Sequence, residues 1–150
     1  MENEEVVSTL KDLIRTLEDG KEGFKLAAES TDNPDMRTLF LHYAAQREQF
    51  SAELHHLSGL DGDEALDIET SLTGALHREW LNLRSALNAG DPGAILAECE
   101  RGENHAVSEY RKALDLPLPT EVVHAIGAQS LEITSAHEKV KYLRDLAMAN

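Results

Sequence analysis

The chain has 150 residues, of which 41% are hydrophobic and 28% are charged, so it fits a single domain spanning residues 1–150 with a full hydrophobic core. Its formal net charge of −14 repels phosphate groups, which argues against nucleic acid and anionic membranes as partners. The single cysteine excludes an internal disulfide bond, and neither a signal peptide nor a membrane-spanning apolar run is recognisable, so we expect a cytoplasmic protein.

The first two predicted elements are long amphipathic helices joined by a tight turn. Apolar residues recur at helical spacing over residues 4–29 and again over residues 34–59. The segment TDNPD ends the first helix and begins the second, because Asn33 suits the N-cap position and Pro34 suits the first helical position. A tight turn between two long helices predicts an antiparallel hairpin.

The second half of the chain repeats this arrangement after the polar segment GLDGDEALD. A shorter third helix is predicted over residues 68–88. Asp91 and Pro92 are the expected cap and first residue of a fourth helix, which runs to about residue 116. The segment LPLPTE separates this helix from a fifth that reaches the C-terminus, so a second hairpin is expected. No strand pattern is present, and we predict an all-α protein.

The connection between the two hairpins leaves two all-α arrangements open. Two antiparallel hairpins joined by one long crossover form a ferritin-like four-helix bundle. In that bundle the third helix would be an additional crossover helix. The alternative is an up-and-down bundle of all the helices, which needs no special connection. We expect the ferritin-like arrangement.

Three long segments also carry a resemblance to known proteins: LEDGKEGFKLAAES, DNPDMRTLFLHYAAQREQF and ECERGENHAVSEYRKAL. They resemble a bacterial family of uncharacterised proteins grouped with the ferritin-like four-helix bundles, and the similarity spans nearly the whole chain. The resemblance implies a ferritin-like bundle with no established activity. Because relatives with this fold often hold two metal ions between carboxylates and E-x-x-H pairs, it also implies that a metal site must be tested for.

The stretch QREQFSAELHHL contains one such pair, Glu53 and His56. At roughly 100° per residue, Glu53 lies roughly 85° from the centre of the apolar stripe and His56 roughly 145° from it. The pair is therefore predicted to lie outside the core. If the protein were nevertheless a di-iron oxidoreductase or an iron-binding protein, the candidate ligands would be Glu18, Glu22, Glu53, His56, Glu100 and Glu103.

Five polar residues fall on or near the inward stripes: Lys21, Arg47, Glu103, Gln129 and, further toward one end, His137. Two cations beside one carboxylate would repel a divalent metal ion. A buried charge is costly unless it is paired, so we expect Glu103 to bond to Arg47, with Lys21 and Gln129 completing a core polar network. Alternatively, Lys21 carries its charge outward and leaves an ordinary contact between Arg47 and Glu103.

Three glycines lie inside predicted helices: Gly20, Gly23 and Gly102. Glycine costs a helix interior about 1 kcal/mol relative to alanine. These residues either let helices approach closely, leave a small cavity, or are tolerated weaknesses.

Three leucines are predicted to point away from the core stripes: Leu26, Leu41 and Leu131. Either the crossover helix or a second subunit could cover them. Helix faces carrying these leucines would suit a homodimer.

Three classes of function are compatible with these patterns. The first is a non-catalytic structural or interaction protein without a cofactor, in which an ion-pair network replaces a metal site. The second is the iron-dependent protein described above. The third is a protein that binds a small anionic ligand in the bundle core through Arg47 or Lys21. We favour the first class and assign no catalytic residue.

Overall fold

The computed structural model describes residues 2–59 and 91–149, and these residues form helices and no strands. The helices are α1 (Asn3–Ser30), α2 (Pro34–Ser58), α4 (Pro92–Leu114) and α5 (Thr120–Met148). The all-α prediction is confirmed for this part of the chain, and the helix bounds differ from the predicted ones by at most a few residues. The predicted helix over residues 68–88 lies outside the described residues. None of the described helices has the length and apolarity needed to cross a membrane.

Local chemistry determines where the helices begin and end. Asn33 caps α2 by accepting hydrogen bonds from backbone N–H groups of its first turn, and Pro34 is the first helical residue. Asp91 caps α4 by accepting a hydrogen bond from the backbone N–H of Gly93. The helix α2 ends at Ser58 and is capped by Gly59, whose φ of 65° lies in the left-handed region that glycine adopts without a steric penalty.

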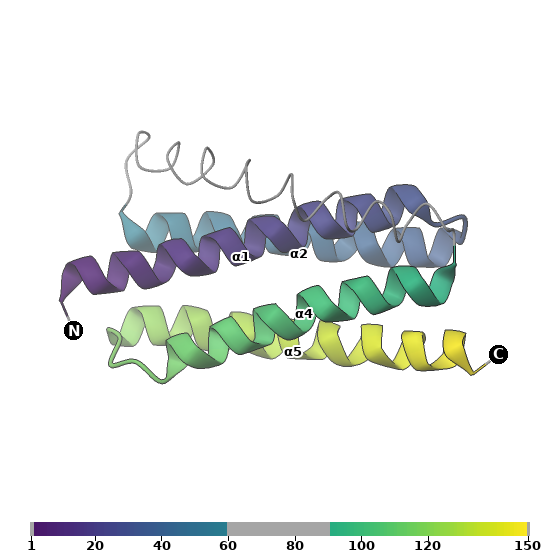
Figure 1. Cartoon of the computed structure of the whole chain (residues 1–150). Coiled ribbons are helices and arrows are strands. Elements are labelled where there is room, and N and C mark those ends of the chain that lie inside the picture. Colours follow the sequence, from purple (N-terminus) through teal and green to yellow (C-terminus); the bar gives the residue numbers. More distant parts are fainter. Residues whose placement is uncertain (1, 60–90, 150) are drawn as a thin grey trace.

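The four described helices are arranged as two antiparallel hairpins (Figure 1), α1 with α2 and α4 with α5. The hairpins pack with α1 against α4 and α2 against α5. As a result, α2 and α4 lie diagonally across the bundle and run in the same direction. The end of α2 and the beginning of α4 lie at opposite ends of the bundle.

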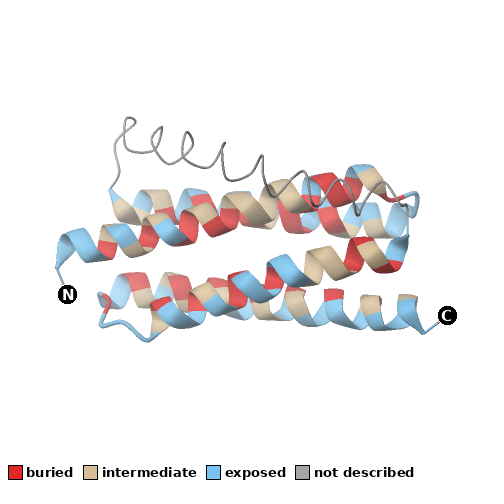
Figure 2. Cartoon of the chain, viewed as in Figure 1, coloured by how far each residue is buried: buried red, intermediate tan, exposed pale blue. Residues whose placement is uncertain are grey.

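Buried residues lie along all four described helices (Figure 2). The described part of the hydrophobic core divides into two clusters in opposite halves of the bundle. Leu10, Leu54 and Tyr110 belong to the cluster near the N-terminus of α1. Phe24 and Phe40 belong to the cluster near the turn between α1 and α2. The buried charged side chains of the described helices, Arg47 and Glu103, lie between the two clusters.

One of the three outward leucines is placed differently from the prediction. Leu26 is only 8% exposed and belongs to the second apolar cluster, so the prediction that it points away from the core is wrong. Ala27 and Ala28, the next two residues of α1, are buried as well, so this end of α1 is buried over more of its circumference than the stripe that its apolar periodicity defines. Leu41 and Leu131 are exposed, at 50% and 74%.

Candidate functional site

The centre of the bundle holds a buried ion pair between α2 and α4. Arg47 donates a hydrogen bond of 2.6 Å from Nη1 to Oε1 of Glu103, and a second of 2.7 Å from Nη2 to Oε2. The two side chains are only 1% and 2% exposed. A two-point contact between a guanidinium and a carboxylate is the strongest geometry available to such a pair. Since α2 and α4 are diagonal to each other, the pair crosses the middle of the core.

Further contacts fix the guanidinium of Arg47. The Phe24 ring packs on it, with 5.5 Å between the ring centroid and Cζ, and Nε donates a hydrogen bond of 3.3 Å to Oε1 of Gln46. A small anion placed at Arg47 would lie beside the carboxylate of Glu103, which would repel it. This geometry disfavours an anion site at Arg47.

Lys21 belongs to a different group from the one expected. Its Nζ lies 2.6 Å from Oε2 of Glu18, which is three residues earlier on the same helix. Oε1 of Glu18 accepts a hydrogen bond of 2.9 Å from the hydroxyl of Ser51 on α2. Burial lowers the pKa of Lys21, but the hydrogen bond and charge of Glu18, with the charges of two nearby glutamates, raise it overall. The expectation that Lys21 joins the Glu103 network is therefore wrong, because a partner one helical turn away is closer.

Gln129 also bonds to groups other than the ion pair. Its Oε1 accepts a hydrogen bond of 2.6 Å from the hydroxyl of Tyr110, and its Nε2 donates one of 3.3 Å to the backbone carbonyl of Phe50. A carboxamide suits this position because it offers an acceptor and a donor at once. Burial raises the pKa of Tyr110 far above its ordinary value, so the phenol remains a hydrogen-bond donor.

His137 lies on α5, in the half of the bundle that contains the turn between α1 and α2, and its side chain faces α4. Its Nε2 is 3.8 Å from Oε1 of Glu100, and that nitrogen is buried without a hydrogen-bond partner. Arg144 forms an ion pair with the other carboxylate oxygen of Glu100. These three residues form a separate group, and His137 does not extend the central pair.

The sequence did not single out Ser51, Tyr110 or Arg144 as partners in these groups. Ser51 and Tyr110 lie on the inward stripes of α2 and α4, where a hydroxyl needs a partner once it is buried. That requirement was the available signal for both residues. Arg144 carried no comparable signal, because its side chain is partly exposed and its role depends on how α5 packs against α4.

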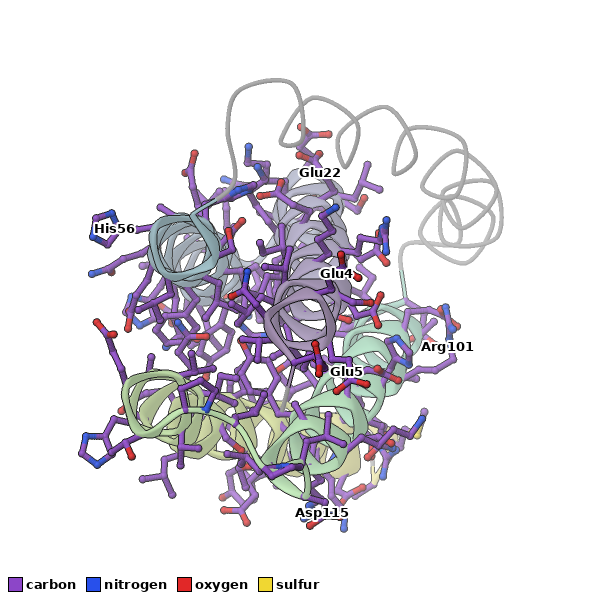
Figure 3. All side chains as sticks on the ribbon, turned by 90° about the vertical axis from the view of Figure 1, so that its left-hand side faces the viewer. Glu4, Glu5, Glu22, His56, Arg101 and Asp115 are labelled. Atoms are coloured by element: carbon purple, nitrogen blue, oxygen red, sulfur yellow. The ribbon has the colours of Figure 1, made fainter. Side chains whose placement is uncertain are left out.

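The six candidate metal ligands do not converge on one point. Three of the carboxylates already face a cation of the chain, namely Glu18 with Lys21, Glu100 with Arg144, and Glu103 with Arg47. Glu53 and His56 are exposed, and Figure 3 shows His56 and Glu22 projecting away from the bundle. Within residues 2–59 and 91–149, no three His, Cys, Asp or Glu side chains are placed to share a metal ion. The six candidate ligands, as the described residues place them, do not form a di-metal centre.

Cys99 lies on α4 and is half-buried. Burial, together with the negative charges of Glu103 and Glu98, raises the pKa of its thiol. Since the thiolate is the reactive form, this environment suppresses nucleophilic chemistry.

Comparison with known protein families gives one result for this chain. The model of a family described as a domain of unknown function, DUF2383, matches residues 5–116. The match begins in the first turn of α1, includes α2 and α4, and ends two residues after α4. A search of curated proteins finds no match.

Proposed function

This chain belongs to the DUF2383 family, and we propose that it is a non-catalytic structural or interaction protein built on a ferritin-like four-helix bundle. Two features support the ferritin-like arrangement. The described helices form two antiparallel hairpins, and α2 runs in the same direction as α4. A single long crossover between two hairpins requires this relation between the second helix of one hairpin and the first helix of the next.

The observation that carries the proposal is the ion pair between Arg47 and Glu103. Ferritin-like proteins build metal sites in the bundle core from carboxylates on facing helices. Here both oxygens of the buried carboxylate accept hydrogen bonds from a guanidinium. A divalent ion at this level would have to displace Arg47 and leave it as a buried, unpaired cation. The pair therefore gives the centre of the core a structural role.

The proposed structural role of the pair is to fix how the two hairpins pack. The attraction between apolar side chains has no preferred direction, whereas a two-point pair is satisfied in only one register. Arg47 lies between the two apolar clusters along α2, and Glu103 occupies the same place along α4. The contact thus determines which level of α2 faces which level of α4.

The test is to measure metal retention. Purified protein is loaded anaerobically with Fe(II), desalted and analysed by elemental mass spectrometry, beside the Glu103→Gln variant. We expect no retained iron above that of a protein without ferritin-like ligands. About two ions per chain, the usual count for such sites, lost in the Glu103→Gln variant, would overturn the proposal.

A second measurement tests whether a small anion binds to Arg47 in the core of the bundle. Melting temperatures are recorded with increasing concentrations of phosphate, sulfate and acetate, for the wild type and for Arg47→Met. A ligand that binds only the folded protein raises its stability with concentration. We expect the wild type and the variant to respond alike. A rise specific to the wild type would assign an anion site to Arg47.

A further inference from the structure

The outward face of α5 carries a second stripe, opposite the buried one. Its exposed members are separated by three or four residues, apart from one adjacent pair at its centre, and are Leu131, Ser135, Glu138, Lys139, Tyr142 and Leu146. The large apolar members remain accessible, with Leu131 74%, Tyr142 59% and Leu146 49% exposed. These three side chains lie at the two ends of the stripe with polar residues between them, and exposed apolar side chains on one face of a helix are the means by which it packs along a second helix.

The net charge of residues 131–146, which carry the stripe, differs from that of the whole chain. Residues 131–146 contain three acidic and three basic residues, whereas the whole chain has a net charge of −14. Two copies of so acidic a protein repel each other over most approaches. The balanced charge of this stretch removes that barrier where the apolar side chains are exposed.

We propose that this stripe is the interface of a homodimer, in which α5 of two copies packs antiparallel about a twofold axis between residues 138 and 139. With this axis, Leu131 of one copy lies opposite Leu146 of the second copy. The small side chain of Ser135 lies opposite Tyr142 of the second copy, and Glu138 lies opposite Lys139. Each of these contacts occurs twice, as an isologous interface requires.

The sequence of the stripe supports a second copy as the occupant. A heterologous partner would not require the stripe to complement itself. When the helix is paired with its own reverse, leucine meets leucine, the large Tyr142 meets the small Ser135, and Glu138 meets the opposite charge of Lys139. The proposal adds an interaction surface to the structural role described above and does not depend on it. Iron retention would overturn the proposed structural role without affecting the dimer interface. A monomeric protein would overturn the interface without affecting the structural role.

The first experiment is sedimentation velocity over a range of concentrations, with circular dichroism to follow the fold. We expect the wild type to be dimeric and Leu131→Glu to raise the dissociation constant by about tenfold or more. Because Leu131 is so exposed, the variant should keep the helix content and melting behaviour of the monomer. Leu116→Glu is the matched control, since Leu116 is 39% exposed and lies between α4 and α5, away from the stripe. It should leave the dimer intact.

A charge exchange tests the antiparallel register. Glu138→Lys places two lysines opposite each other at both symmetric positions and should weaken the dimer. Adding Lys139→Glu restores opposite charges at those positions and should recover most of the affinity. A wild type that is monomeric at all concentrations, a dimer insensitive to Leu131→Glu, or a double variant no tighter than the single one would overturn the proposal.

Discussion

Arg47 and Glu103 join the two helical hairpins through two short hydrogen bonds in the centre of the core. The direct helix packing is between neighbours, α1 with α2 and α4, and α5 with α2 and α4, whereas this pair connects the diagonal helices. Removing two charges from water costs several kcal/mol per ion, which the attraction between them offsets only when the geometry is good. The pair is therefore better explained by the specificity of packing than by a large net gain in stability.

Arg47→Ala should destabilise the protein strongly. The substitution leaves the carboxylate of Glu103 buried without its cation, and breaking a buried pair in this way costs about 3–5 kcal/mol. Urea unfolding followed by circular dichroism would measure the loss of free energy. Arg15→Ala is the control, because Arg15 pairs with Asp12 at the surface and such pairs contribute about 0–1 kcal/mol. Equal losses in the two variants would contradict the buried pair.

Replacing both partners should be far less harmful than removing one. In Arg47→Met/Glu103→Leu no buried charge remains, and apolar replacement of a buried pair is often neutral or stabilising by about 1–4 kcal/mol. We expect the urea midpoint of unfolding to be higher for the double variant than for Arg47→Ala. Its unfolding transition should be at least as cooperative. If the double variant were as unstable as Arg47→Ala, the ion pair itself would contribute net stability, because methionine at position 47 keeps most of the apolar stem of the arginine and no charge is stranded.

Much of the fold could be predicted from the sequence because the relevant signals are local. The caps at Asn33 and Asp91, the prolines that follow them and the apolar periodicity define four helices within a few residues. The wrong assignment of Leu26 has a tertiary cause. Leu26 lies about 180° around the helix from Leu17, so its burial cannot be read from the periodicity of α1 alone.

The candidate site was predictable where a charge had to be buried. Arg47 and Glu103 fall on inward stripes at a similar height, so their pairing follows from the cost of an isolated buried charge. The partners of Lys21 and Gln129 depended instead on which group lies nearest. Lys21 reaches Glu18 within its own helix, and Gln129 reaches Tyr110 and a backbone carbonyl. Helical angles alone do not resolve such choices.

Gly23→Ala and Gly102→Ala should each stabilise the protein by about 0.5–1 kcal/mol. Both glycines lie within helices, and among residues 2–59 and 91–149 no heavy atom outside the adjoining helix backbone would lie within 4 Å of a Cβ built on either. The alternative that they permit close helix approach is therefore not supported for these two positions. At Gly20 the added Cβ would lie 3.7 Å from Arg47, an ordinary contact. Thermal unfolding of the single variants measures the gain.

The control for the helix glycines is Gly59→Ala, which should have the opposite sign. Gly59 has a φ of 65°, where an alanine side chain costs about 1–2 kcal/mol. Stabilisation by Gly59→Ala, or destabilisation by Gly102→Ala, would contradict this assignment of roles.

Stability should fall as pH rises above about 10. Burial raises the pKa of Tyr110 above its ordinary value of 10.0, so this phenol stays neutral in the folded protein while the unfolded chain ionises. A raised folded pKa contributes stability that is fully present below the unfolded pKa and is lost above it. Burial and the charge of Glu103 also raise the pKa of Tyr43, and the raised pKa of Lys21 acts in the same direction.

Tyr110→Phe isolates the contribution of one group to this alkaline loss. The variant lacks the hydroxyl that bonds to Gln129, so it should be less stable at neutral pH by about 1–3 kcal/mol. Its stability should nevertheless fall less steeply with pH, by up to about 1.4 kcal/mol per pH unit, because one ionising group has been removed. Urea unfolding at several values between about pH 8 and about pH 11.5, which spans the ordinary tyrosine pKa, gives both slopes. Tyr43 and Lys21 remain, so part of the fall should persist. Identical slopes in the wild type and the variant would mean that the Tyr110 phenol ionises equally in the folded and unfolded states, which its burial opposes.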